Sequence, residues 1–110
     1  MKRSLALESS NVQRICGMLG FARRAGKTVI GTELVCRAMP KGEVKLVVIS
    51  ERCSDGTMKK LTVKCDFYRI PWVLAPIDTE ALAKTVGKSS AVAAVAVTDT
   101  RFAEEIKKAT

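Results

Sequence analysis

Residues 44–50 read VKLVVIS and residues 91–97 read AVAAVAV, and these two stretches decide the fold class. Each is a short, almost continuous apolar run rather than an alternation of apolar and polar residues. Runs of this kind are typical of strands that are covered on both faces. We therefore expect both segments to be buried strands of one sheet.

Segments with apolar residues at helical spacing surround these two runs. Each begins after a capping residue or ends at a glycine or proline, which are the signals that bound a helix. The predicted helices run from a Ser9–Ser10 cap to Gly26, from Gly31 to Met39, from a Ser54–Asp55 cap to Phe67, from an Asp78 cap to Gly87, and onward from an Asp99 cap. Short strands are predicted at residues 28–30 and 72–74.

Helices and strands thus alternate along the chain. This order is typical of an α/β domain that has helices on both faces of a sheet. A chain of 110 residues has room for one such domain. We expect residues 10–110 to form the domain and residues 1–9 to be a flexible tail.

The chain is strongly basic, with 19 Lys and Arg against 11 Asp and Glu and a net charge of +8. Such an excess attracts polyanions, of which nucleic acid is the commonest in the cytoplasm. A stacking platform for single strands needs several exposed rings. The chain has only five aromatic residues, Phe21, Phe67, Tyr68, Trp72 and Phe102. We assign them to the core, so structured RNA or DNA is the expected partner.

The cysteines do not have the spacing of metal ligands. Cys16, Cys36, Cys53 and Cys65 form no Cys-x-x-Cys pair, and the chain has no histidine. We expect reduced thiols, no metal and no cofactor. Cys16 and Cys36 fall on apolar helical positions and are predicted to be buried.

Neither a membrane span nor a signal peptide is expected. No stretch approaches the roughly 18–20 consecutive apolar residues that a spanning helix needs. Lys2 and Arg3 are followed only by the short apolar segment 5–7. We therefore predict a cytoplasmic protein.

Residues 25–28 read AGKT and resemble the end of a phosphate-binding P-loop. That loop requires a glycine five positions before Gly26, where Phe21 stands, and it follows a strand rather than a helix. Without histidine, a cysteine nucleophile also lacks its usual base. The sequence therefore indicates a protein without catalytic activity, although a pocket containing a Cys or Lys of strongly shifted pKa would favour an enzyme.

Basic residues cluster around the start of the second predicted helix. Gly31 permits close approach of another backbone, and the first N–H groups of a helix are donors to an anion. Glu33 and Arg37 are four residues apart and lie on one helix face. Such a pair is ordinarily only a solvated ion pair, but Arg23, Arg24 and Lys27 nearby favour phosphate binding.

The string at residues 19–61, LGFARRAGKTVIGTELVCRAMPKGEVKLVVISERCSDGTMKKL, resembles bacterial YlxQ-type members of the kink-turn-binding ribosomal protein superfamily (L-seven-Ae and L-thirty-e type). The similarity continues through Gly87–Lys88, AVAVTD at residues 94–99 and the closing helix, and it covers residues 11–108. The resemblance implies a single-domain three-layer α-β-α sandwich with a small mixed central sheet. It also implies binding to the sharply bent RNA motif called a kink-turn.

In this family the second helix starts with Gly-Thr-Asn-Glu or a variant, followed by a basic residue. Gly31 and Thr32 match that motif, and Arg37 matches the basic position. Glu33 replaces the asparagine and Leu34 replaces the glutamate. A carboxylate at position 33 can accept from guanine amino and imino groups, whereas a leucine cannot.

The resemblance implies a second contact, from the loop before the last strand to a flipped-out nucleotide. Arg52, which follows the 44–50 strand, borders the same surface in the resembling fold. The predicted RNA-binding residues are Arg23, Arg24, Lys27, Gly31, Thr32, Glu33, Arg37, Arg52, Lys88, Ser89, Ser90 and Ala91.

By resemblance, the partner is a structured RNA, such as ribosomal RNA or an RNA kink-turn, and the setting is the ribosome or other translation proteins. The alternative is a protein–protein adaptor that keeps the fold and has lost kink-turn recognition. An exposed Leu34 would favour the adaptor, and a buried Leu34 would remove its main support.

Overall fold

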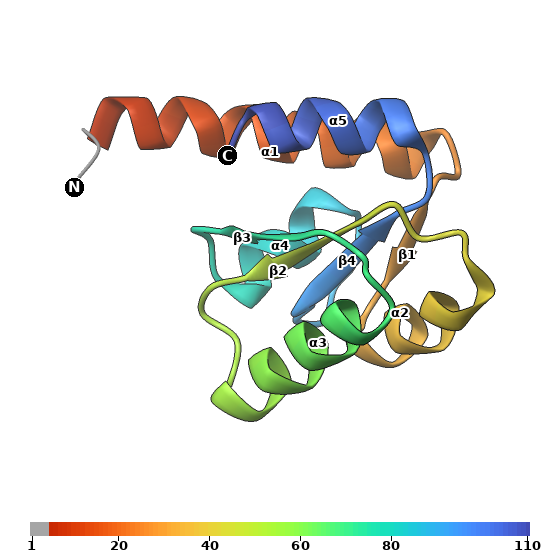
Figure 1. Ribbon diagram of the computed structural model, residues 1–110. Coiled ribbons are helices and arrows are strands. Elements are labelled where there is room, and N and C mark those ends of the chain that lie inside the picture. Colours follow the sequence, from red (N-terminus) through yellow and green to blue (C-terminus); the bar gives the residue numbers. More distant parts are fainter. Residues whose placement is uncertain (1–4) are drawn as a thin grey trace.

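The computed structural model describes residues 5–110, and it describes side chains from residue 11 onward. Helices and strands alternate as the sequence predicts (Figure 1). The elements are α1 (Leu5–Arg24), β1 (Thr28–Ile30), α2 (Thr32–Ala38), the 3-10 helix η1 (Met39–Lys41), β2 (Leu46–Ser50), α3 (Asp55–Phe67), β3 (Trp72–Ala75), α4 (Thr79–Thr85), β4 (Ala94–Val97) and α5 (Thr100–Lys108).

The four strands form one mixed sheet in the order β1-β4-β2-β3. Strand β4 pairs antiparallel with both β1 and β2, while β2 and β3 are parallel. The two apolar runs therefore supply the central strands β2 and β4, and the shorter predicted strands form the edges. This confirms the small mixed sheet.

Helices cover both faces of the sheet, so the chain folds as the predicted three-layer α-β-α sandwich (Figure 1). Successive side chains of β2 point to opposite faces because strand residues alternate. Leu46 and Val48 pack with buried residues of α1, α4 and α5, whereas Val47 and Ile49 pack with buried residues of α2 and α3. Each face of β2 thus has its own apolar core.

Three of the predicted helix caps are confirmed. Each cap side chain accepts a hydrogen bond from a backbone N–H three residues later, which satisfies one of the free donors of the first turn. The donors are Thr57 for the Ser54 cap of α3 (3.2 Å), Ala81 for the Asp78 cap of α4 (2.7 Å) and Phe102 for the Asp99 cap of α5 (3.1 Å).

Helix α1 begins earlier than predicted. It starts at Leu5 rather than after Ser9–Ser10, because Leu, Ala and Glu at residues 5–8 are strong helix formers that extend it. Residues 5–9 of the expected flexible tail therefore belong to α1. Residues 1–4 of that tail lie outside the described residues.

Strand β4 is shorter than the apolar run that predicted it. Val92 N–H donates to the carbonyl of Thr79 at 3.0 Å, so the first residues of the run are attached to α4. The strand starts only at Ala94. Residues 87–93 form the loop between α4 and β4, which we call the α4–β4 loop.

The prediction that the aromatic residues lie in the core is wrong for three of the five, while Trp72 and Phe102 do pack against the core. Phe21, Phe67 and Tyr68 are exposed, and Trp72 and Phe102 are only partly buried. Aliphatic side chains of the helices fill the space on both faces of β2 and β4.

Cys16 and Cys36 are less buried than predicted, since both are only partly buried, although Cys36 packs against the core under α2 and α3. Cys65 is buried in the core under α2 and α3, and burial raises the pKa of its thiol to about 12. Within the described part of the chain, no group of metal-ligating side chains could hold an ion. No described helix is long and apolar enough to cross a membrane.

Candidate functional site

Three loops meet at the end of the sheet where β1 and β2 stop and β4 starts. Gly31 N–H donates to the carbonyl of Ala94 at 2.9 Å, and Ser50 N–H donates to that of Ala93 at 2.8 Å. The start of α2 and the loop after β2 therefore flank the last residues of the α4–β4 loop.

Gly31 precedes α2 in a conformation that favours glycine. Its φ is +102°, in the region that L side chains rarely adopt. A Cβ at this position would meet no atom of the described residues beyond its chain neighbours within 4 Å, so close approach by another described segment is not the reason for the glycine. Among the described residues, the space over Gly31 is open, and no described side chain caps the first N–H groups of α2.

At its other end, the α4–β4 loop contacts the last turn of α1. A Cβ built on Gly87 would lie 2.7 Å from Cζ of Arg23, so the guanidinium rests directly against this glycine. Gly87 also has a positive φ of +72°. Arg23 is therefore brought next to Lys88, which lies 65 positions later in the chain.

The α4–β4 loop consequently extends from the end of α1 to the start of α2, beside the edge strand β1. Its exposed residues Lys88, Ser89, Ser90 and Ala91 lie between these two contacts. Exposed Lys27 lies at the start of β1, where its carbonyl accepts from Thr98 N–H at 2.9 Å. The three-residue strand β1 lies between Lys27 and Gly31, so their Cα atoms are only about 13 Å apart.

We call this area the β1-edge surface. It comprises Arg23, Lys27, Gly31, Thr32 and Lys88 to Ala91. Three basic side chains surround glycine, serine and alanine positions, and none of the three forms an ion pair with a described residue. The surface thus combines positive charge with small side chains.

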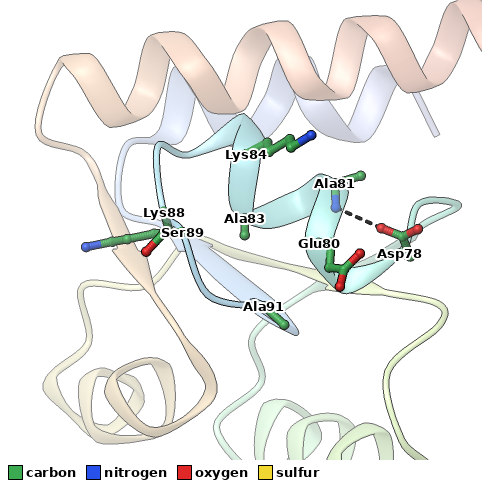
Figure 2. A pocket seen from close by; sticks show the side chains of 8 residues that line it. All are labelled: Asp78, Glu80, Ala81, Ala83, Lys84, Lys88, Ser89 and Ala91. Atoms are coloured by element: carbon green, nitrogen blue, oxygen red, sulfur yellow. Dashed lines mark hydrogen bonds between the residues drawn. The ribbon is translucent and has the colours of Figure 1, made fainter.

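A cavity of about 460 Å³ lies beside this surface, between α4 and the loop that follows it. Its walls carry both signs of charge. Figure 2 shows Asp78 and Glu80 on one side, with Lys88 extending away from them. The lining residues are Asp78, Glu80, Ala81, Ala83, Lys84, Lys88, Ser89 and Ala91.

Glu33 does not pair with Arg37. Its Oε2 lies 3.3 Å from Nζ of Lys60 on α3, in an exposed ion pair. Arg37 is exposed at the end of α2, and no ion pair joins it to any side chain that the structure describes. The alternative interpretation, a solvated Glu33–Arg37 pair, is therefore not what the structure contains, because α3 brings Lys60 to Glu33.

Two other predicted residues stand apart from the β1-edge surface. The Arg24 guanidinium lies over the ring of Phe21, 5.0 Å from its centroid, so α1 itself holds this side chain. Arg52 is exposed in the loop after β2, where its N–H donates to Oγ of Ser50 at 3.1 Å. Arg52 thus borders the α4–β4 loop from the side opposite Gly31.

Sequence reasoning missed Lys60 and Lys84. Lys60 lies 27 residues from Glu33, so no local pattern connects them. Lys84 lies in the last turn of α4 and four residues before Lys88, a spacing that could have indicated a second basic residue at the cavity.

The chain matches a known family over most of its length. Residues 13–107 match the model of the Ribosomal protein L7Ae/L30e/S12e/Gadd45 family. The chain belongs to this family. Its α-β-α sandwich is thus the fold of an L7Ae-family member.

Two relatives in this family are each named RNA-binding protein YlxQ. The one from Bacillus subtilis is 39% identical over 90 residues, covering 81% of this chain and 87% of that protein. The one from Enterococcus faecium is 28% identical over 102 residues, covering 93% of this chain and 96% of that protein.

Solved structures agree with the L7Ae-family fold. A protein of unknown function from Bacillus halodurans C superposes with a TM-score of 0.80 at 31% identity, covering 87% of this chain and 95% of that chain. The Giardia lamblia 15.5kD RNA binding protein gives a TM-score of 0.71 at 15% identity, covering 99% of this chain and 87% of that chain. At that identity the second likeness shows the fold alone.

Proposed function

We propose that this L7Ae-family protein binds structured RNA, a kink-turn or a related bent motif, through the β1-edge surface. One observation carries the proposal: the α4–β4 loop lies between Arg23 and Gly31, so basic and small residues from distant segments form one continuous surface. The names of the two YlxQ relatives support RNA as the ligand.

Phosphate contacts would supply most of the affinity. Arg23, Lys27 and Lys88 are exposed around the α4–β4 loop, and Arg37 is exposed on α2. Cationic side chains at a nucleic-acid surface position the backbone and release counterions. The small residues between them allow an RNA strand to approach the protein backbone closely.

Discrimination among RNAs would come from the start of α2. The carboxylate of Glu33 can accept from guanine amino and imino groups. In the free protein it pairs with Lys60, but both side chains are exposed. An exposed ion pair contributes only about 0–1 kcal/mol, so Glu33 can exchange Lys60 for a base at little cost.

A matched pair of RNAs tests the proposal. One is a kink-turn, and the other is the same RNA with its tandem G·A pairs changed to Watson–Crick pairs. One good base contact discriminates by about 1–3 kcal/mol, so the kink-turn should bind about 5- to 150-fold more tightly in a filter-binding titration. Equal affinities for the two RNAs would exclude kink-turn recognition.

The setting that we propose is the ribosome or another translation assembly in the cytoplasm, with no catalytic role. The chain has no histidine, and the one thiol whose pKa is raised to about 12 lies in the core rather than in a pocket. Ribosome association can be tested by sedimenting a cell extract at low and high salt. Cofractionation with a ribosomal subunit at low salt supports the proposal, and its absence there contradicts it.

One observation favours the adaptor as a second candidate. Leu34 replaces a polar family residue and is 53% exposed on the first turn of α2. If Leu34 is a protein contact, Leu34→Ser should leave the affinity for the kink-turn unchanged and weaken binding to a protein partner. If it packs against RNA, the same change should weaken RNA binding.

A further inference from the structure

The outward face of α3 carries apolar side chains where a surface helix is normally polar. Leu61 and Cys65 are buried against the sheet, and Val63 and Phe67 lie on the opposite side of the helix. Val63 is 56% exposed and Phe67 is 77% exposed. Helix α3 therefore has a second apolar face that nothing in the described chain covers.

This face follows a regular spacing. Gly56, Lys60, Val63 and Phe67 recur at intervals of four, three and four residues, which keeps them on one line along the helix. The same spacing forms the seam between two packed helices. Gly56 leaves open space at one end, and the ring of Tyr68 extends the apolar area at the other, edge-on to Phe67 with centroids 4.9 Å apart.

Lysines border this line on both sides. A shallow, largely apolar cavity of about 440 Å³ is lined by Val63 and Gly56 together with Lys59, Lys60 and Lys64. Lys60 is paired with Glu33, whereas no described side chain forms an ion pair with Lys59 or Lys64. We call Gly56, Lys59, Lys60, Val63, Lys64 and Phe67 the α3 seam.

We propose that the α3 seam docks an acidic amphipathic helix of a partner protein. A helix with apolar residues at the same spacing would cover Val63 and Phe67, as an amphipathic helix covers an apolar groove. Glutamate or aspartate on its flanks would pair with Lys59 and Lys64. The apolar line of the seam thus matches the apolar face of such a helix, and the flanking lysines match its acidic residues.

Two other occupants fit less well. A second copy of the chain would place lysines of one seam against those of the other, and like charges across an interface oppose association. An RNA strand would gain from the lysines but would cover Val63 with phosphates and sugars, where an apolar side chain contributes little. The inference does not depend on RNA binding at the β1-edge surface.

A synthetic peptide can test this inference directly. The probe is a helix of about four heptads, long enough to be stable, with leucine along its seam and glutamate on both flanks. It is titrated into the ¹⁵N-labelled full-length protein. The expected result is saturable binding with amide shifts concentrated in residues 54–68.

Substitutions on the seam should weaken this binding. Val63→Ser with Phe67→Ser removes the apolar anchors from positions that are already exposed, so the fold is retained. Loss of two central anchors should raise the dissociation constant about tenfold or more. Lys59→Glu with Lys64→Glu should have a comparable effect. The charge-matched control Lys41→Glu with Lys45→Glu, at exposed positions that are not on α3, should change the affinity much less.

Several results would overturn the proposal. One is equal binding of a peptide whose leucines are replaced by serine, because net charge alone would then explain the interaction. Another is an oligouridine RNA that shifts the same amides and depends on Phe67, which would make the seam an RNA surface. A third is a dimer in sedimentation equilibrium that Val63→Ser with Phe67→Ser dissociates.

Discussion

Gly87 shows how a single residue can position a loop. Its φ of +72° disfavours any other residue, and Arg23 occupies the place that a side chain would need. Adding a methyl group therefore strains the backbone and displaces the guanidinium from the end of the α4–β4 loop. Local strain of this kind costs about 1–3 kcal/mol.

The first prediction follows: Gly87→Ala should lower the free energy of unfolding by about 1–3 kcal/mol in urea denaturation. Gly17→Ala is the control. Gly17 lies within α1, and no described atom outside the helix's own nearby backbone lies within 4 Å of the place that an added methyl group would take, so alanine there should stabilise the protein by about 0.5–1 kcal/mol. Equal stabilities of Gly87→Ala and wild type would show that Arg23 and the loop adjust freely.

Glu33 is the second residue that decides between interpretations of the site. If its carboxylate accepts from guanine, Glu33→Ala should weaken kink-turn binding, by about 5- to 150-fold for a complete base contact. Removing a negative charge should at the same time strengthen binding to a plain hairpin. The two RNAs should therefore respond in opposite directions.

The control for this titration is Glu43→Ala, which makes the same charge change at another exposed position. It should strengthen binding to both RNAs alike. If Glu33→Ala also strengthens both RNAs equally, Glu33 is only a repulsive surface charge, and the start of α2 contributes no base recognition.

At the scale of elements, helix α3 combines a buried thiol with an exposed seam. Burial raises the pKa of Cys65 from 9.0 to about 12, so the folded state keeps this proton more tightly than the unfolded state does. Between these two values the unfolded chain has lost the proton while the folded chain retains it. The contribution of the protonated Cys65 thiol to the stability of the folded state is therefore complete below pH 9 and is lost as pH rises toward 12.

We accordingly predict that the Cys65 thiol of α3 makes the stability of the protein decrease at alkaline pH. Between pH 9 and 12, this single thiol should lower the free energy of unfolding by about 1.4 kcal/mol per pH unit. In Cys65→Ala, which has no thiol to titrate, the dependence on pH should be shallower by that amount. Parallel slopes for the two proteins in urea denaturation across this pH range would contradict the assignment.

The elements that the sequence predicts well are those whose signals are local. Ser54, Asp78 and Asp99 cap helices a few residues away, and the apolar run of β2 is long enough to identify a central strand. Other features depend on contacts between distant segments. Arg23 meets Gly87, and Glu33 meets Lys60, only because the sheet and helices bring them together.

The exposure of the aromatic residues also depends on contacts between distant segments, which the sequence does not show locally. Phe67 ends α3 on the side away from the sheet, and whether that side is covered depends on the placement of every other helix. For the candidate site, the basic residues and the glycines could be identified from sequence. Their grouping into one surface required the fold, which places Arg24 and Arg52 apart from it.

At the scale of the whole molecule, the net charge of +8 should govern how RNA affinity depends on salt. If about four to six phosphates are neutralised, the logarithm of the association constant should fall with the logarithm of salt concentration at a slope near −3 to −5. Filter binding across a salt series measures this slope. A flat response would exclude a largely electrostatic mode of binding.

The central claim is that the α4–β4 loop and the start of α2 act as one RNA-binding surface. The most direct measurement is a titration of the ¹⁵N-labelled protein with a kink-turn RNA, followed by amide chemical shifts. We predict that the shifts concentrate at Gly31, Thr32 and Lys88 to Ala91. Shifts confined to the α3 seam or to α5, with these amides unmoved, would contradict the claim.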